Sequence, residues 1–291
     1  MYRLYISIAV FGFALQNTLY AKYARALNGI TLVVIRNVSL IAVGAIALFR
    51  VRGDQYGDVI TYWQPITRTA LLWVSHLILN YEAYKYLPVW TANVLKKGVA
   101  TITWFFIGYF LLGEQLQVTQ YLLISAVVIF CLLLANKKSD AAHLEHASHR
   151  KGIAFLSISG ILSTAAWYGF KQYADHLNPF LASYLLEASV GVMSLFVLPV
   201  YTWYSGSSFQ KATSRQITQI TIISFVTIFS TIAYTYALQS GLFSLSNALV
   251  ICSLPVVCLL WVVLYQENLS KKQIILISII ILCLISLKLV S

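Results

Sequence analysis

The chain has 291 residues, of which 59% are hydrophobic and only 10% are charged. Soluble globular proteins contain about 25% charged residues, so this composition cannot supply a soluble protein with its polar surface. Disordered, collagen-like and coiled-coil chains have other compositions and are excluded as well. The mean hydropathy of +0.78 agrees. The composition therefore indicates an integral membrane protein.

Ten apolar stretches are long enough to cross the hydrocarbon core, which takes about 20 helical residues. A β-barrel would show short alternating strands instead, whereas Tyr121–Ala135 and Ile274–Leu287 are apolar on every side. The sequence predicts an all-α integral membrane protein with loops at 50–67, 137–151 and 204–215. The ten predicted helices span residues 4–22, 30–49, 68–87, 89–112, 117–136, 152–172, 179–203, 216–238, 242–265 and 271–290.

The net charge of +11 does not form a patch of the kind that binds nucleic acid, because most Lys and Arg residues stand at helix ends. Such residues anchor helices to lipid headgroups. With the N-terminus inside, the cytoplasmic segments hold six basic residues and the opposite segments hold eleven. The positive-inside rule taken alone thus favours an N-terminus outside the cell.

The start of the chain and the cysteines each have a simple interpretation. Arg3 and the apolar run Leu4–Leu15 resemble a signal peptide, but the repeat described next runs through the cleavage region. All four cysteines lie within predicted helices, without the spacing of a disulfide framework or a metal site. We expect packing residues at Cys131, Cys252, Cys258 and Cys283.

Two halves of the chain repeat one another. The segment 23–28 (YARALN) recurs at 173–178 (YADHLN), and 111–116 (LLGEQL) recurs at 264–269 (LYQENL). Asn93 and Asn247 correspond near the starts of helices four and nine. An odd number of helices per repeat inverts the second half, the arrangement found in alternating-access transporters. We therefore expect one five-helix repeat at 1–136, a connecting loop at 137–151 and a second repeat at 152–291.

The chain resembles the drug/metabolite transporter superfamily in its EamA-type branch. The resemblance rests on ten helices, two inverted halves and the motif Leu112-Gly113-Glu114-Gln115-Leu116 at the end of helix four. The second half has Gln266 where the family usually has glycine. Members export amino acids or drugs, import metabolites, or exchange nucleotide sugars and phosphorylated sugars. The resemblance implies cytoplasmic termini, against the charge count above.

Lys96 and Lys97 are the strongest candidates for a substrate site. They lie seven or eight residues into helix four, about 10–12 Å from its start, where charged residues are costly and commonly functional. Because neighbours on a helix point about 100° apart, we expect one lysine to face a cavity and the other a neighbouring helix. Members of the superfamily that carry sugar phosphates often have a lysine here, which favours an anionic substrate. A packing role for both remains the alternative.

Arg36 and Glu187 occupy almost equivalent places in helices two and seven of the two halves. Opposite charges there are expected to pair across the symmetry axis, since each offsets the burial cost of the other. The sequence leaves two interpretations open for the pair. It is either purely structural or part of gating or proton coupling, with Arg36 also contributing to substrate binding.

Further polar residues complete the candidate site. We expect Glu82 and Lys85 to pair at the end of helix three, where Glu82 is either an interfacial anchor or a gating residue. His76 is either a coupling residue that titrates near neutral pH or a packing histidine. Additional candidates for substrate binding are Gln16, Asn93, Asn247, Trp167 and Tyr168, with Asn17 and Lys171 beside them.

Two conspicuous groups are interpreted without chemistry. Glu114 and Glu267 each close a helix hairpin, and we expect them to cap the start of the next helix. His143, His146 and His149 fall in the predicted loop, where a solvated surface is favoured over a metal site. There is no nucleophile–base pair, phosphate loop or metal motif. We expect no enzymatic activity, cofactor or metal.

The sequence therefore predicts a secondary transporter for a small polar metabolite that carries carboxylate or phosphate. The expected setting is a bacterial inner membrane, as a monomer or dimer coupled to protons or to solute exchange. Efflux of cationic drugs is an alternative, although Met1–Tyr23 lacks the glutamate that small multidrug members use. A non-transporting scaffold or sensor is another, and it leaves Lys96, Lys97 and Arg36 unexplained.

Overall fold

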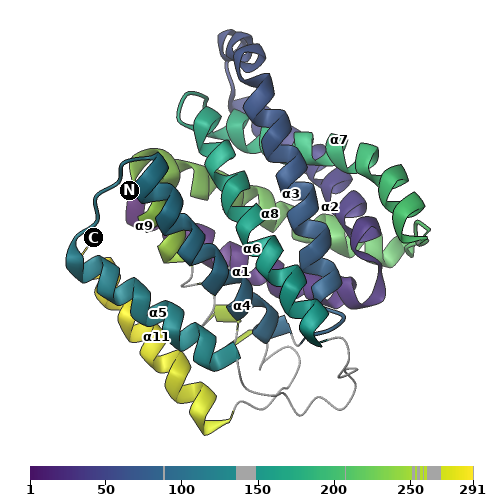
Figure 1. The fold of residues 1–291 in the computed structure, drawn as a ribbon. Helices are drawn as coiled ribbons and strands as arrows, with labels where there is room; N and C mark the ends of the chain where they lie inside the picture. Colours follow the sequence, from purple (N-terminus) through teal and green to yellow (C-terminus); the bar gives the residue numbers. More distant parts are fainter. Residues whose placement is uncertain are drawn as a thin grey trace.

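The computed structural model describes residues 1–87, 89–135, 149–206, 208–250, 253, 256–257, 259–260 and 270–290. Across these residues the protein is all-helical and contains no strand, as predicted (Figure 1). The elements in chain order are α1 (Tyr2–Ala26), α2 (Gly29–Gly44), the 3₁₀ helices η1 (Ala45–Arg50) and η2 (Gly53–Tyr62), α3 (Trp63–Ala83), α4 (Val89–Phe106), the π-helical turn η3 (Ile107–Leu111), α5 (Val118–Ala135), α6 (His149–Ala174), α7 (Pro179–Ser205), α8 (Ser214–Ser240), α9 (Phe243–Val250) and α11 (Lys271–Val290).

Six of the helical segments are long and apolar enough to cross a membrane. They are α1, Gly29–Arg50, Thr91–Leu111, α6, α7 and α8. The apolar parts of α5 and α11 are shorter, at Val118–Phe130 and Ile274–Cys283. α3 is not among the six, and it carries Arg68, His76, Asn80 and Glu82. Each of the ten predicted stretches thus contains a helix among the described residues. Six of these helical segments are long and apolar enough to span a membrane.

Two predicted loops differ from the structure. The segment 50–67 contains η2 and the first turn of α3. Pro65 is compatible with this early start, because the first turn of a helix does not need its backbone N–H. In the segment 137–151, residues 137–148 lie outside the described part, and they include His143 and His146. His149 is the first residue of α6 rather than a loop residue.

The repeated YAxxLN segment has the same structural role in both halves, because its Asn caps the following helix. The Asn28 side chain accepts a hydrogen bond from the backbone N–H of Thr31 at the start of α2. Asn178 accepts one from the N–H of Phe180 at the start of α7. Such caps satisfy N–H groups that have no partner within the helix. The sequence repeat therefore marks two equivalent helix junctions.

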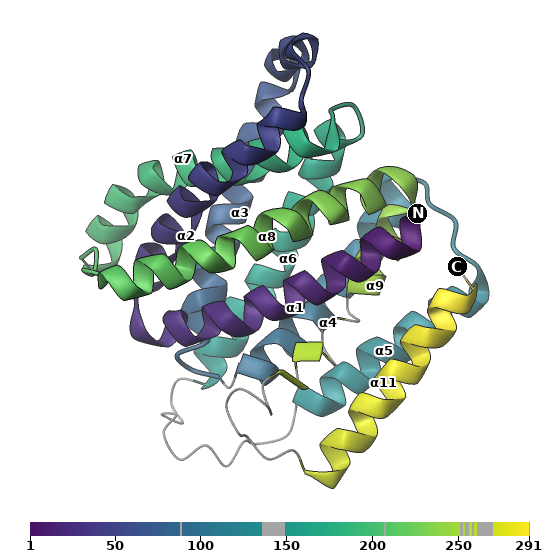
Figure 2. The same ribbon diagram turned by 180° about the vertical axis from the view of Figure 1, so that it is seen from behind.

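The contacts between helices are repeated when the two halves of the chain are interchanged. α3 packs on α6 as α8 packs on α1, and α2 contacts α8 as α7 contacts α3. α2 and α7 pack against each other, and so do α5 and α11. Figures 1 and 2 show α5 and α11 side by side at one edge of the bundle. Because both segments are nearly free of charge, the sequence predicts that helices five and ten form a peripheral pair and that helices one to four and six to nine line a cavity. The peripheral pair is confirmed.

Glycines allow the closest helix contacts. A Cβ atom on Gly12 of α1 would lie 1.8 Å from Ser230 Oγ of α8. A Cβ atom on Gly191 of α7 would lie 2.6 Å from the Ile41 side chain of α2. Neither contact leaves space for a side chain, and small residues let helix backbones approach closely in membranes. These two junctions hold α1, α2, α7 and α8 together around the candidate site.

Candidate functional site

A cavity lies between the two halves of the chain. It has about 80 Å³ of space for the centres of water molecules. Its lining comes from α1, α2, α3, α4, α6, α8 and α9, whereas α5 and α11 contribute none of the described lining residues. α7 contributes none either, which corrects the expectation that helices one to four and six to nine all line the cavity. The polar lining residues are Gln16, Asn17, Arg36, His76, Asn80, Lys96, Lys97, Ser163 and Asn247.

Lys96 and Lys97 both line this cavity. The expectation that only one of them faces it is therefore wrong. Lys96 is only 7% exposed, and the Lys97 ammonium lies 5.8 Å from the centre of the Trp104 ring. Among the described residues, no carboxylate lies within ion-pair distance of either ammonium. The two ammonium groups therefore face the cavity without a described acidic counterion.

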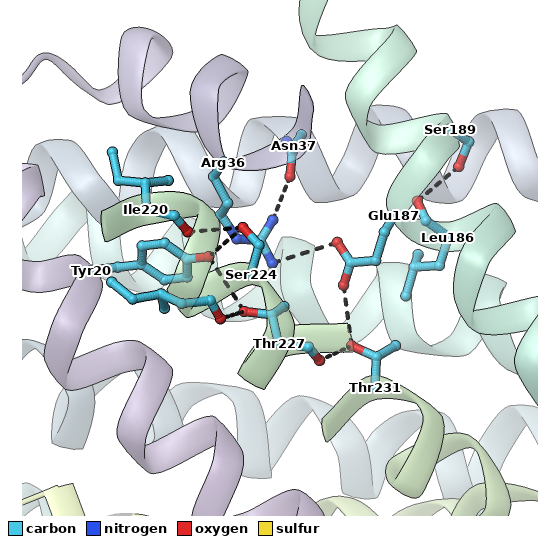
Figure 3. A network of polar contacts seen from close by, with 11 residues as sticks. Tyr20, Arg36, Asn37, Leu186, Glu187, Ser189, Ile220, Ser224, Thr227 and Thr231 are labelled. Carbon is cyan, nitrogen blue, oxygen red and sulfur yellow. Dashed lines mark hydrogen bonds and ion pairs between the residues drawn. The ribbon is translucent and has the colours of Figure 1, made fainter. Parts of the chain in front are cut away.

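Arg36 and Glu187 form the predicted ion pair. Arg36 Nη2 lies 3.5 Å from Glu187 Oε2, and the side chains are 4% and 2% exposed. Arg36 also donates to the Asn37 side chain, and Glu187 Oε1 accepts from the Thr231 hydroxyl at 3.1 Å. Figure 3 shows the guanidinium between α2 and α7. Since Arg36 lines the cavity and Glu187 does not, the arginine connects the cavity to the carboxylate.

Hydroxyl groups of α8 surround this ion pair (Figure 3). The Tyr20 hydroxyl lies 3.3 Å from Ser224 Oγ and 3.4 Å from Thr227 Oγ1. The guanidinium carbon of Arg36 lies 5.6 Å from the centre of the Tyr20 ring. Buried charges of this kind are tolerated when both are paired and hydrogen bonded. The network therefore ties α1, α2, α7 and α8 together at the wall of the cavity.

Five of the remaining candidates also line the cavity, namely Gln16, Asn17, His76, Trp167 and Asn247. His76 has a packing role as well, because its Nδ1 lies 2.9 Å from the carbonyl oxygen and 2.8 Å from the hydroxyl of Ser159. Tyr168, Asn93 and Glu82 are not among the lining residues.

Asn93 and Asn247 make equivalent hydrogen bonds in the two halves. The Tyr84 hydroxyl donates to Asn93 Oδ1 at 3.4 Å, and the Tyr234 hydroxyl donates to Asn247 Oδ1 at 2.8 Å. Tyr84 follows α3 and Tyr234 lies in α8, 150 residues apart. Asn247 faces the cavity in addition. The paired asparagines thus fix a helix junction in each half.

Glu82 is engaged at the end of α3. Its carboxylate pairs with Lys85 at 2.8 Å, as predicted, and accepts a hydrogen bond from the backbone N–H of Gly29 at 2.6 Å. The Tyr201 hydroxyl donates to the same carboxylate at 3.4 Å. These contacts join the ends of α2, α3 and α7. Lys171 pairs with Asp175 at 2.9 Å and does not line the cavity.

Glu114 caps a helix that is distant in the chain. Its carboxylate accepts from the backbone N–H of Phe243 at the start of α9. The start of α5 is capped by Gln120, which accepts from the N–H of Gln117. Gly113 has a φ of 63°, which turns the chain after the π-helical turn. Glu267, the counterpart of Glu114, lies outside the described residues.

Sequence reasoning missed most of the aromatic lining, and helical spacing carried a signal for it. Trp73, His76, Leu77, Asn80 and Tyr81 all line the cavity. Their spacing of three, four, seven and eight residues puts them on one face of α3. Phe13, Gln16 and Tyr20 form a similar stripe on α1. Extending a stripe from each polar candidate would have found these residues.

The described residues contain no group of three His, Cys, Asp or Glu side chains placed to hold a metal ion. Cys283 of α11 is a free thiol. The side chains of the other three cysteines lie outside the described part of the structure.

No protein-family model and no curated protein matches the sequence. A solved structure described only as the crystal structure of a protein is similar in fold, with a TM-score of 0.67 and 14% sequence identity. The similarity covers 96% of this chain and 95% of the other. At that identity the likeness concerns the fold alone. The chain therefore shares its complete fold with a solved protein of similar length.

Proposed function

We propose that the protein is a secondary transporter that moves a small anionic metabolite by alternating access. The observation that carries the proposal is the pair Lys96 and Lys97, whose ammonium groups line a buried cavity. Arg36 lines it too, but its charge is balanced by Glu187. The lysines thus leave a positive surplus among the described lining residues, where the attraction to an anion is stronger than in water. A carboxylate or phosphate group supplies the missing charge.

The proposal includes ten membrane-spanning helices in two inverted five-helix repeats, as in the EamA-type branch of the drug/metabolite transporter superfamily. Three observations support it. The contacts between helices are equivalent in the two halves. Asn28 and Asn178 cap equivalent helices. Asn93 and Asn247 each accept a hydrogen bond from an equivalent tyrosine. Transporters of this design bind substrate near the midplane, where the repeats meet.

The lining argues against a cation as substrate. No Asp or Glu is among the described lining residues, and Glu187 is already paired with Arg36. A cationic drug entering next to Lys96 and Lys97 would meet like charge, which raises its energy. We therefore propose an anion rather than a cation as the substrate. The proposal also includes a bacterial inner membrane as the location and no enzymatic step.

A screen of the purified chain tests this function. Thermal unfolding is measured with amino acids, organic acids, sugar phosphates and matched cations, because a ligand that binds only the folded state raises its stability. Uptake of the best radiolabelled hit is then measured in proteoliposomes, with protein-free liposomes as control. We expect saturable uptake of an anion. Stabilisation by cations alone, or the absence of uptake for every stabilising solute, would contradict the proposal.

A further inference from the structure

Aromatic rings make up most of the hydrophobic part of the cavity wall. Seven aromatic side chains line it, contributed by α1, α3, α4, α6 and α8. Aliphatic lining is sparse by comparison, with Leu77, Ala100 and Val250 as its members among the described residues. Rings offer flat faces with negative potential and edges with positive potential. The rings can therefore contact a part of the ligand other than its acid group.

Four of these rings form a connected cluster around Trp167. Its centroid lies 4.6 Å from that of Trp73 and 4.4 Å from that of Tyr234, with interplanar angles of 84° and 59°. Phe13 lies 6.3 Å from Trp167 at 56°. Edge-to-face and tilted contacts are the favoured arrangements of aromatic pairs. Because no two of these rings are stacked flat, the cluster presents both faces and edges.

Two of the cations lie against rings of this wall. The Lys97 ammonium is 5.8 Å from the Trp104 centroid, and the Arg36 guanidinium carbon is 5.6 Å from that of Tyr20. Cation–π contacts of this length hold the positive groups at the ring faces. An acid group that binds either cation therefore lies next to an aromatic side chain. The rest of the ligand is then directed along the aromatic wall.

Buried polar atoms in the same wall lack hydrogen-bond partners among the described residues. They are the amide oxygens of Gln16 and Asn80 and the indole nitrogen of Trp73. All three residues line the cavity, and they are 9%, 2% and 8% exposed. An unpaired buried polar group costs free energy. Two free acceptors favour a ligand that also donates hydrogen bonds, as a hydroxyl or amino substituent does.

The cavity suits a small ligand. It offers about 80 Å³ to the centres of water-sized groups, which is more than one bound water needs. A single ring with one acid group is a small ligand of this kind, whereas a nucleotide sugar is far larger.

Building on the proposed transport function, we propose that the substrate is a single-ring aromatic acid that carries a hydroxyl or amino substituent. Its acid group binds at Lys96 and Lys97, its ring packs against the cluster around Trp167, and its substituent donates to Gln16 or Asn80. The aromatic wall thereby selects the ring, and the lysines select the charge.

Two acids that share charge and approximate size test the role of the ring. Binding of benzoate and cyclohexanecarboxylate is measured by calorimetry on the full chain in lipid nanodiscs, with empty nanodiscs as control for partitioning. An aromatic contact is worth about a 2- to 10-fold change in affinity. We expect benzoate to bind about fivefold more tightly, and 4-hydroxybenzoate more tightly still.

Variants add a second comparison. Trp167→Leu should remove the preference for benzoate, whereas Trp203→Leu should keep it, because Trp203 of α7 is 85% exposed. Equal affinity of the two acids for the wild-type chain would overturn the inference even if Trp167→Leu does not fold. If the two acids bind equally well and Lys97→Gln loses the binding of both, only the aromatic inference fails. The anion site of the proposed function then still stands. Absence of binding by every acid tested would overturn the transport proposal itself.

Discussion

The ion pair between Arg36 and Glu187 gives the sharpest stability prediction. Its atoms are 3.5 Å apart and its side chains are almost fully buried. Replacing one partner leaves the other as an uncompensated buried charge, which costs about 3–5 kcal/mol. Replacing both removes that penalty. We therefore expect Arg36→Gln and Glu187→Gln each to destabilise the protein strongly, and the double variant to recover most of the loss.

The two single variants should differ. Without Glu187, the guanidinium keeps its hydrogen bond to Asn37 and its contact with the Tyr20 ring. Without Arg36, the carboxylate keeps the Thr231 hydroxyl as its described partner. Arg36→Gln should therefore fall near the upper end of the range and Glu187→Gln near the lower end. The coupling energy is the sum of the two single losses minus the loss of the double variant, so it should exceed either single loss and be on the order of 5 kcal/mol or more.

Reversible unfolding by SDS, followed by tryptophan fluorescence, measures these free energies. The surface pair Lys171 and Asp175 is the matched control, because the Asp175 side chain is 37% exposed. Exposed pairs contribute at most about 1 kcal/mol, so Lys171→Gln and Asp175→Asn should show little coupling. Additive losses for Arg36→Gln and Glu187→Gln would refute the reasoning and show that the two residues do not interact in the folded protein.

Three further predictions concern glycines and the lysine pair. Gly113→Ala should cost about 1–2 kcal/mol of unfolding free energy, because the φ of Gly113 is 63° and an L-residue is strained there. A Cβ at Gly113 or at Gly53 would meet no atom, so Gly53→Ala is the control without the positive φ and should cost less in the same assay. Gly12→Ala should cost about 1–3 kcal/mol because its Cβ would overlap Ser230, and wild-type stability would show that α1 and α8 are not so close. Lys97→Arg should keep part of the uptake, since the charge remains while the geometry changes, and full loss would show that geometry dominates.

The sequence predicted the helices well because each is a long apolar stretch with a recognisable end. The motif around Gly113 marked the end of helix four, whereas the capping roles of Asn28 and Asn178 were seen only in the structure. The loop at 50–67 was predicted wrongly because η2 is a 3₁₀ helix whose glycines and aspartates (Gly53, Asp54, Gly57 and Asp58) are typical of loops. The six shown spanning segments exclude α3 because its polar residues lower its hydropathy. Two of them, His76 and Asn80, line the cavity.

The candidate site was predicted in part. Buried charge was a reliable indicator, since Arg36 and Glu187 pair and both lysines line the cavity. The prediction that only one lysine faces the cavity failed. It assumed that two neighbours about 100° apart on a helix cannot line one cavity, but Lys96, Lys97, Ala100 and Trp104 of α4 all line it. The partner of Glu114 could not be predicted, because Phe243 is 129 residues away in the chain.

Uptake by the lysine variants tests the central claim most directly. The anion that most stabilises the wild-type chain is radiolabelled, and its uptake is compared in proteoliposomes that contain the wild type, Lys96→Gln, Lys97→Gln or Lys22→Gln. Lys22 of α1 is exposed and controls for loss of charge. The account predicts that uptake is lost in Lys96→Gln or Lys97→Gln, with folding retained, and is unchanged in Lys22→Gln. Undiminished uptake in both Lys96→Gln and Lys97→Gln would contradict it.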